Sequence, residues 1–448
     1  MTPAIFYHPE AYSTDGPQLM GRNAAGKSFM RGFLQHRSTE GFCIVVDDRA
    51  AVPIFEQEFG KYIADAKFSV VSKENLDQLK SKVVYYPGPQ LAHHAWAREH
   101  FGSKTWSLCG ITHTTSSAAA MDSIVNLFTA PIQPWDTLIC TSEAVKSNVA
   151  NILDAQKYFL TRRLKATNFV LPQMPVIPIG IECDMFEATD EQSEISRRRL
   201  GLDSDTLAVL YMGRLSFHAK AHPLPMYQAL EAAALKSRKK VVLIECGWFA
   251  NEPVERAFTD AALMMCPSVR VVRLNGRDPD QRRLAWTSAD IFCSFADNIQ
   301  ETFGITPIEA MAAGIPLVVS DWDGYKDTVT DGREGYRVPT CMAPPGAGQD
   351  LAFRHSIGLD SYDRYCGYTS SFVAVDVGKA IDAFVALFES KDLRNSMAAA
   401  AVATARSRFD WRVVIPQYEE LWTEMTEIRN NVEAIDSLID PEPARLEP

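Results

Sequence analysis

The sequence predicts an α/β protein with two Rossmann-like domains, each a parallel sheet flanked by helices. Short apolar runs rich in β-branched residues alternate with segments of helical length, a pattern typical of βα units. A polar stretch from Glu187 to Asp205 interrupts the alternation, which then restarts. Because 448 residues are enough for two domains, we place the boundary near residue 190.

The first domain is predicted over residues 1–188. Its apolar runs have strand length, and helix-length segments separate them, so we expect a parallel sheet. In order, the expected strands are IFYH from Ile5, FCIVVD from Phe42, KFSVV from Lys67, KVVYY from Lys82, WSLCGIT from Trp106, DTLICT from Asp136 and MPVIPI from Met174.

The second domain is predicted over residues 189–405, where the same alternation returns. In order, its expected strands are LAVLYMG from Leu207, VVLIECG from Val241, VRVVRLNG from Val269, ADIFCSFA from Ala289, IPLVVSDW from Ile315 and GYRV from Gly335.

A helical segment is expected over residues 406–435, packing back toward the first domain. From Pro416 onward it carries an apolar stripe at spacings of three and four, which must be buried against another element. The stripe consists of Tyr418, Leu421, Trp422 and Met425. The tail 436–448 is Pro-rich and charged, and we expect it to be mobile.

Composition and charge exclude several classes of protein. With 45 basic and 56 acidic residues the net charge is −11, which repels phosphate backbones, so we expect no nucleic-acid partner.

The nine scattered cysteines lack a C-x-x-C pair and are interpreted as buried free thiols in a reducing cytoplasm. No signal peptide or membrane-spanning run is evident, so any membrane contact would be peripheral. The basic runs 162–165 and 236–240 would suit anionic lipid if they lay on one face.

Residues 301–320 carry the most informative pattern, which predicts a loop, a helix, a turn and a strand. Thr306 is the expected N-cap, Pro307 the first helical residue and Glu309 a capping-box carboxylate. Gly314 is expected to end the helix.

The start of this helix predicts an anion site. Its first amides and positive dipole end would face an anion, and Glu301 and Glu309 on either side would accept hydrogen bonds from sugar hydroxyls. The pattern suits a nucleotide-diphosphate sugar. The alternative is that Glu309 only caps the helix and Glu301 is a solvated loop acid.

Two cations follow the strand LAVLYM, in the sequence GRLSFHAK from Gly213 to Lys220. Open α/β sheets bind ligands at the carboxyl ends of their strands. Arg214 and Lys220 together can hold a diphosphate and neutralise the charge that develops as it leaves, without a metal. The alternative is a solvated loop.

These residues resemble the retaining nucleotide-sugar glycosyltransferases of the GT-B fold, specifically glycosyltransferase family 4. The resemblance spans most of residues 100–340. The matching pieces are Glu301-x7-Glu309, GRLS with Lys220, IPLVVSDWDGYKDTV, DGREGYRVPT, WDTLICTSEAVKS and VIPIGIECDMF. It implies two parallel sheets facing across a cleft that holds the donor, and hexosyl transfer (EC 2.4) to a glycan, lipid-linked or small-molecule hydroxyl, as in polysaccharide biosynthesis.

The resemblance also implies residue roles in donor binding. Arg214 and Lys220 would grip the donor diphosphate. Glu301 would bind hydroxyls of the donor sugar, and Glu309 those of the ribose. Three backbone amides would contact the phosphate and the sugar, those of Phe303, Gly304 and Ile305.

In the first domain, His113 in ITHTT matches the family's active-site histidine, which faces the donor sugar, and Gly16 matches a glycine-containing loop near the donor phosphates. In this family no enzymic nucleophile is usually identified, and a donor phosphate oxygen is thought to take the acceptor proton. No cofactor and no metal are expected, because Arg214 and Lys220 can neutralise the departing diphosphate. Ala221 stands where the family often has glycine.

The segment 341–372 looks like an insertion where most relatives have a short loop. Its aromatic residues leave three alternatives open: local packing, an oligomer contact, or the lining of an acceptor site. They include Tyr362, Tyr365, Tyr368 and Phe372. The oligomeric state, the nucleotide base and the sugar are also left open.

Two motifs compete with this interpretation. GRNAAGKS at 21–28 satisfies the phosphate-loop pattern, which gives the alternative of a P-loop NTPase using Lys27. A separate alternative is a non-catalytic nucleotide-sugar binding protein. The residues after Met20 have the pattern of a helix, whereas a true phosphate loop directly follows a strand, so the pattern disfavours the NTPase. Asp321-Trp322-Asp323 resembles a metal-binding D-x-D pair, but turn chemistry after a strand explains it better.

Overall fold

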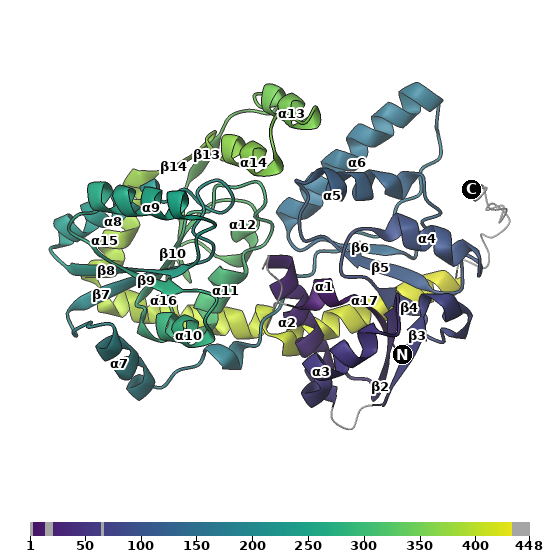
Figure 1. The fold of residues 1–448 in the computed structure, drawn as a ribbon, viewed down its shortest axis with the longest axis horizontal. Helices are drawn as coiled ribbons and strands as arrows, with labels where there is room; N and C mark the ends of the chain where they lie inside the picture. The colour runs from purple at the N-terminus through teal and green to yellow at the C-terminus, as the bar shows by residue number, and fades with distance from the viewer. Residues whose placement is uncertain (1–2, 14–20, 64–66, 432–448) are drawn as a thin grey trace. The chain divides into compact units, whose positions relative to one another are not determined.

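The structure, a computed structural model, describes residues 3–13, 21–63 and 67–431. Gly16 and the predicted tail 436–448 lie outside these residues. The chain divides into two compact units, of which the first combines Met1–Ile181 with Trp411–Pro448 and the second is Glu182–Asp410 (Figure 1).

The unit boundaries differ by a few residues from the predicted ones at 188 and 405. The backbone around Ile177 bonds to the strand end at Cys140, and Trp411 N donates to Ile181 O at 3.0 Å, so both segments stay with the first unit. Phe409, at the end of a π-helical turn over Ala405–Phe409, packs its ring against Phe303 of the second unit.

The first unit contains a six-stranded parallel sheet in the order β3-β2-β1-β4-β5-β6. Its strands are β1 (Ala4–Tyr7), β2 (Gly41–Val46), β3 (Lys67–Ser72), β4 (Val83–Tyr85), β5 (Ser107–Ile111) and β6 (Thr137–Ile139). The prediction of a strand at MPVIPI is wrong. Only an isolated bridge joins Cys140 and Val176 there, because Pro175 and Pro178 cannot donate to a ladder.

Helices cover both faces of this sheet. They are α1 (Pro9–Tyr12), α2 (Gly21–His36), α3 (Ala51–Ile63), α4 (Leu91–Glu99), α5 (Ala118–Val125), α6 (Glu143–Leu164) and α17 (Trp411–Asn431). Ser142 caps α6 by accepting from Val145 N at 3.1 Å. Asp136, which is fully buried, pairs with Arg98 of α4 at 2.6 Å and accepts from the backbone N–H of Leu108, so it ties α4 and β5 to the start of β6.

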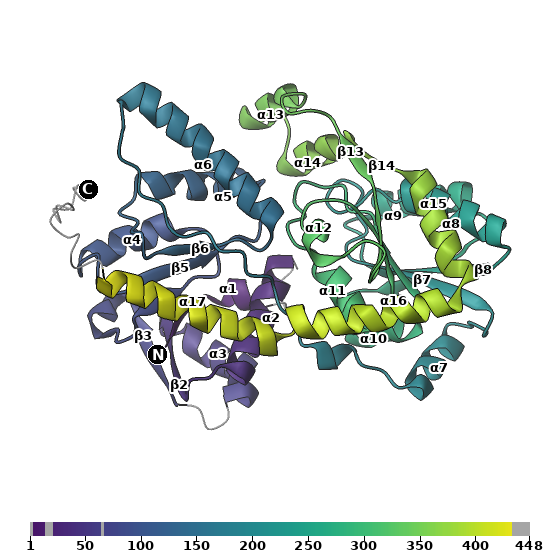
Figure 2. The same cartoon turned by 180° about the vertical axis from the view of Figure 1, so that it is seen from behind.

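Helix α17 provides the burial expected of the C-terminal stripe. It begins at Trp411, within the predicted segment 406–435, has Pro416 inside it, and lies along α2 (Figure 2). Tyr418 and Trp422 are buried and pack against Phe29 and Tyr85. Trp411 itself lies over Gly32, where any side chain would collide with its indole.

The second unit contains another six-stranded parallel sheet, in the order β12-β11-β10-β7-β8-β9. Its strands are β7 (Thr206–Met212), β8 (Lys240–Gly247), β9 (Arg270–Asn275), β10 (Ile291–Ser294), β11 (Leu317–Ser320) and β12 (Gly335–Val338). All six predicted strands are present, and the predicted α/β class with two parallel sheets is confirmed.

The helices of the second unit are α7 (Asp190–Arg199), α8 (Leu224–Ser237), α9 (Glu252–Met265), α10 (Pro279–Ser288), α11 (Ile305–Ala312), α12 (Tyr325–Thr328), α13 (Gln349–Ser356), α14 (Tyr362–Ser370), α15 (Val377–Glu389) and α16 (Lys391–Thr404). The predicted insertion 341–372 contains α13 and α14, which are flanked by an antiparallel pair, β13 (Thr340–Met342) and β14 (Val373–Val375) (Figure 1).

Two further observations concern the cysteines and the membrane. Eight cysteines are buried as predicted, but Cys341 on β13 is exposed because it lies in the insertion and not in the sheet. Within the described ranges, none of the helices combines the length and the apolar character needed to cross a bilayer.

Candidate functional site

The second unit has a topological switch point between β7 and β10. These strands are neighbours in the sheet, but β8 and β9 extend it on one side and β11 and β12 on the other. The loops that leave the carboxyl ends of β7 and β10 therefore diverge and leave a crevice, which is where open α/β sheets bind ligands. The sequence-predicted residues of this unit lie on these two loops and on α11.

The loop after β7 brings Lys220 to Glu301 on the loop after β10. Their side chains form an ion pair and are 24% and 10% exposed. Arg214 is held within its own loop, because Tyr211 Oη donates to its carbonyl at 3.0 Å and its guanidinium donates to Ala219 O at 3.2 Å. Two cations and one carboxylate are thus fixed at the switch point before any ligand binds.

Helix α11 begins at this point, but its cap differs from the prediction. Gly304, with φ 91°, is the N-cap, so Thr306 is inside the helix and the predicted capping box is wrong. A side chain at Gly304 would lie 2.3 Å from the buried ring of Tyr325, and positive φ also requires glycine here. Gly314, with φ 71°, follows the helix end as predicted.

Because α11 begins at Gly304, no earlier helical turn supplies carbonyl acceptors for its first backbone N–H groups. These groups and the positive end of the helix dipole therefore face outward. Phe303, before the cap, is only 2% exposed. Its side chain is therefore an anchor, and only its backbone is available to a ligand. Ile305 is half-buried as the first residue of the helix.

Glu309 is partly exposed on the first turns of α11. Burial raises its pKa to about 7, and the cation of Arg282 offsets part of this effect. Arg282 belongs to α10 and donates to Gly276 O at 3.0 Å. Sequence reasoning missed Arg282, because only the fold brings α10 to α11.

Asp323 is a second carboxylate that sequence reasoning did not place in the site. Burial and, to a lesser extent, the charge of Glu301 raise its pKa to about 7. It lies in the turn after β11 with φ 43°, while Asp321 pairs with Arg337 at 3.5 Å. Among the described residues, the three-ligand clusters suited to a metal do not include either aspartate. The position of Asp323 in a turn is what the turn interpretation of this motif expects.

His113 belongs to the first unit, in the loop after β5. It is partly buried, and desolvation lowers its pKa to about 4, with a smaller contribution from the charge of Arg22. Its imidazole is therefore neutral at neutral pH. Gly16, the other first-domain candidate, lies outside the described residues.

The phosphate-loop motif at 21–28 lies inside α2. Lys27 pairs with Glu58 at 2.6 Å, and Ser28 Oγ accepts from the indole of Trp411 at 2.9 Å. Gly26 packs so closely on α1 that a side chain would lie 2.1 Å from Ala11 O. A helix packed in this way cannot wrap phosphates with its backbone amides, so the geometry argues against the P-loop NTPase.

Part of the chain is similar to known glycosyltransferases. Residues 192–344 match the family model described as glycosyl transferases group 1. The chain is 34% identical over 151 residues to a phosphatidyl-myo-inositol mannosyltransferase of Mycobacterium leprae, covering 33% of this chain and 30% of that one. It is 24% identical over 321 residues to a D-inositol 3-phosphate glycosyltransferase of Corynebacterium aurimucosum, covering 71% and 67%. The chain thus matches less than a third of the mannosyltransferase's length.

Solved structures share the fold. Anabaena HepE in complex with UDP gives a TM-score of 0.58 at 16% identity and covers 95% of this chain and 100% of that one. WaaG, a glycosyltransferase involved in lipopolysaccharide biosynthesis, gives 0.52 at 13% identity and covers 95% and 99%. The two parallel sheets therefore form a GT-B fold.

Proposed function

We propose that this protein transfers a sugar from a nucleotide-diphosphate donor to an acceptor hydroxyl. The GT-B fold and the match of residues 192–344 to the group 1 glycosyl transferases support this proposal. The observation that carries the proposal is the pairing of Lys220 with Glu301 beside Arg214 and the start of α11. Cations, free amides and a carboxylate at one switch point match a ligand that combines phosphates with hydroxyls.

Arg214, Lys220 and the first amides of α11 would bind the diphosphate. Positive charge there stabilises the leaving group as the bond between the anomeric carbon and the phosphate oxygen breaks. Glu301 would accept hydrogen bonds from the donor sugar and Glu309 from the ribose. Because Arg214 and Lys220 already supply positive charge, we propose that the reaction needs neither a metal nor a cofactor.

We also propose net retention at the anomeric carbon, as the resemblance to family 4 implies. The acceptor oxygen would bond to that carbon on the face the diphosphate leaves, and the acceptor proton would pass to the departing phosphate oxygen. Catalysis would then rest on positioning and charge stabilisation. His113, with its lowered pKa, would act as a neutral hydrogen-bonding partner of a sugar hydroxyl.

The proposal is tested first by donor binding, which needs no knowledge of the acceptor. Thermal unfolding is followed with UDP, GDP and ADP and their sugars, in EDTA and then with magnesium, because a ligand of the folded state raises its stability. We expect a shift in EDTA with one base, lost in Arg214→Ala and Glu301→Ala. Arg256→Ala, on the exposed face of α9, is the matched control. A normal shift in both site variants would refute the site.

Turnover separates an enzyme from a non-catalytic binding protein. The relatives' names contain inositol in lipid-linked and phosphorylated form, so phosphatidylinositol and D-inositol 3-phosphate are the first acceptors to test. Release of the nucleoside diphosphate that depends on an acceptor supports transfer. Donor binding without release, against these and a panel of glycans, would favour the binding protein.

We propose a cytoplasmic enzyme with peripheral contact to anionic lipid through the end of α6. Arg162, Arg163 and Lys165 are exposed there. Tyr158, Phe159 and Leu164 beside them are 63%, 55% and 66% exposed, a mixture of basic and apolar groups that suits a lipid interface.

Co-sedimentation with phosphatidylglycerol vesicles tests this contact, with pure phosphatidylcholine vesicles as the reference. Arg162→Glu/Arg163→Glu should reduce the bound fraction, whereas Arg198→Glu/Arg199→Glu, an exposed pair on α7, should not. Equal binding to both kinds of vesicle would contradict the proposal.

A further inference from the structure

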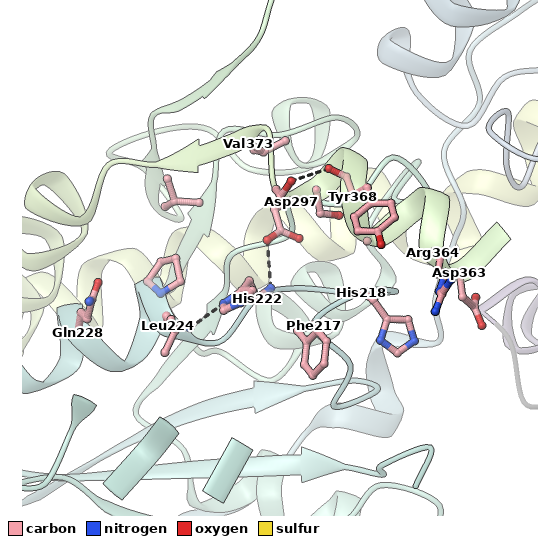
Figure 3. A pocket seen from close by; sticks show the side chains of 15 residues that line it. Phe217, His218, His222, Leu224, Gln228, Asp297, Asp363, Arg364, Tyr368 and Val373 are labelled. Carbon is pink, nitrogen blue, oxygen red and sulfur yellow. Dashed lines mark hydrogen bonds between the residues drawn. The ribbon is translucent and has the colours of Figure 1, made fainter. Parts of the chain in front are cut away.

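The second unit contains a cavity of about 790 Å3 that the proposed donor site does not use. Its walls come from the loop before α8, the start of α8, the loop after β10, α14 and β14 (Figure 3). None of Arg214, Lys220, Glu301 and Glu309 is among the residues that line it. The cavity is therefore separate from the residues to which donor binding is assigned.

The insertion 341–372 provides one wall and is fixed in place. The side-chain amide of Asn298 donates to His218 O at 2.9 Å and to Ser370 Oγ at 3.0 Å. Gln300 bonds in the same way to the thiol of Cys366. At Gly367 an added Cβ would lie 2.9 Å from Cβ of His218, so α14 touches the loop. These hydrogen bonds and close contacts hold α14 in place as one wall of the cavity.

Asp297 gives the cavity its chemistry. It is only 4% exposed, and its Oδ2 accepts from His222 N at 3.0 Å, as Figure 3 shows. Its Oδ1 is buried and, among the described residues, has no hydrogen-bond partner. A buried carboxylate oxygen without a donor is disfavoured and burial raises the pKa of Asp297 to about 7, so a ligand that supplies a donor would stabilise the ionised form.

The rest of the wall is mostly apolar and does not neutralise this carboxylate. Phe217, Leu224 and Val373 line it (Figure 3). Arg364 is exposed and lies 4.0 Å from the carboxylate of Asp360. Burial lowers the pKa of His222, so this ring is neutral at neutral pH.

We propose that this cavity binds a small amine with an apolar body, whose ammonium group donates to Oδ1 of Asp297. An apolar cavity with one convergent polar group is the usual form of a small-molecule site. A protonated amine both donates the missing hydrogen bond and supplies the missing opposite charge, whereas an alcohol does only the first. The proposal is independent of the glycosyltransferase function, because it involves no donor and no transfer.

The test uses three probes with the same apolar body, titrated calorimetrically into the full chain without nucleotide. They are 4-phenylbutylamine, 4-phenylbutan-1-ol and 4-phenylbutanoate. We expect the amine to bind at least about tenfold more tightly than the alcohol, as charge-assisted hydrogen bonds exceed neutral ones. The carboxylate should bind most weakly.

Variants locate the site. Asp297→Asn should bring the amine to the affinity of the alcohol, and Asp363→Asn, an exposed carboxylate on the same wall, should leave the preference unchanged. Melting temperatures establish that each variant is folded. If Asp297→Asn does not fold, Tyr368→Ala, which removes an exposed part of the apolar wall, should weaken all three probes. Equal affinity of amine and alcohol, no saturable binding, or an unchanged preference in Asp297→Asn would overturn the proposal, as would unchanged binding in Tyr368→Ala.

Discussion

Lowering the pH from 8 to 6 should weaken donor binding about tenfold through Glu309, as follows from its pKa of about 7. Ribose hydroxyls donate to the ionised carboxylate, so the apparent Kd rises as the ionised fraction falls. For a pKa of about 7, that fraction is about 0.9 at pH 8 and about 0.1 at pH 6. The ratio corresponds to about 1.4 kcal/mol of binding free energy.

Calorimetric titration of the nucleotide sugar at several pH values measures this dependence. A nucleotide sugar suits it because both phosphates are esterified and do not titrate near neutrality. Glu309→Gln should bind more weakly at pH 8 and lose the pH dependence. Asp323→Asn is the control, because the pKa of Asp323 is also raised to about 7. A flat profile in the unaltered protein, a slope kept in Glu309→Gln, or a slope lost in Asp323→Asn would refute the assignment.

Three further substitutions test the structural reasoning. Asp136→Asn should lower the free energy of unfolding in urea by about 3 kcal/mol or more, because it leaves the buried Arg98 without its charge partner; a loss below about 1 kcal/mol would contradict this. Gly304→Ala should cost at least about 1–3 kcal/mol, because the strain of positive φ adds to the clash with Tyr325, and it should also weaken donor binding; unchanged affinity would mean that the entry to α11 does not form the phosphate site. Lys27→Ala should leave nucleotide binding unchanged and cost about 1–3 kcal/mol, because it leaves the largely buried carboxylate of Glu58 without its cation; loss of nucleotide binding would revive the phosphate-loop alternative.

The sheets could be predicted because most of their strands are buried. A parallel strand buried on both faces is a continuous apolar run, and the runs at Leu207 and Val241 became β7 and β8. The run at Met174 has the same composition, but its prolines remove ladder donors, so it forms only a bridge. The apolar stripe of α17 predicted burial but not its partner, because a stripe does not specify which surface covers it.

The candidate site could be predicted in part because its residues follow strands. Arg214 and Glu301 lie on loops after β7 and β10, and the carboxyl ends of parallel strands meet at one edge of the sheet. Asp297 and Asp323 also lie at this edge, but their importance comes from burial, which only the fold determines. The cap at Gly304 was missed because Thr306-Pro307 is also a good helix start, and the contact with Tyr325 that makes the earlier glycine necessary is not local.

The two glutamates of one sequence motif have different electrostatic surroundings, and this difference supports separate roles. Glu301 is paired with Lys220, so its charge is already compensated and it can orient hydroxyls without a large desolvation cost. Among the described residues Glu309 has no ion pair as close as this, and its raised pKa indicates that its carboxylate is stabilised less than in water. Hydroxyl donors would therefore stabilise the ionised form of Glu309 most when they arrive with the ligand. On this argument Lys220 fixes Glu301 before the donor binds, whereas Glu309 acquires its stabilisation from the donor itself.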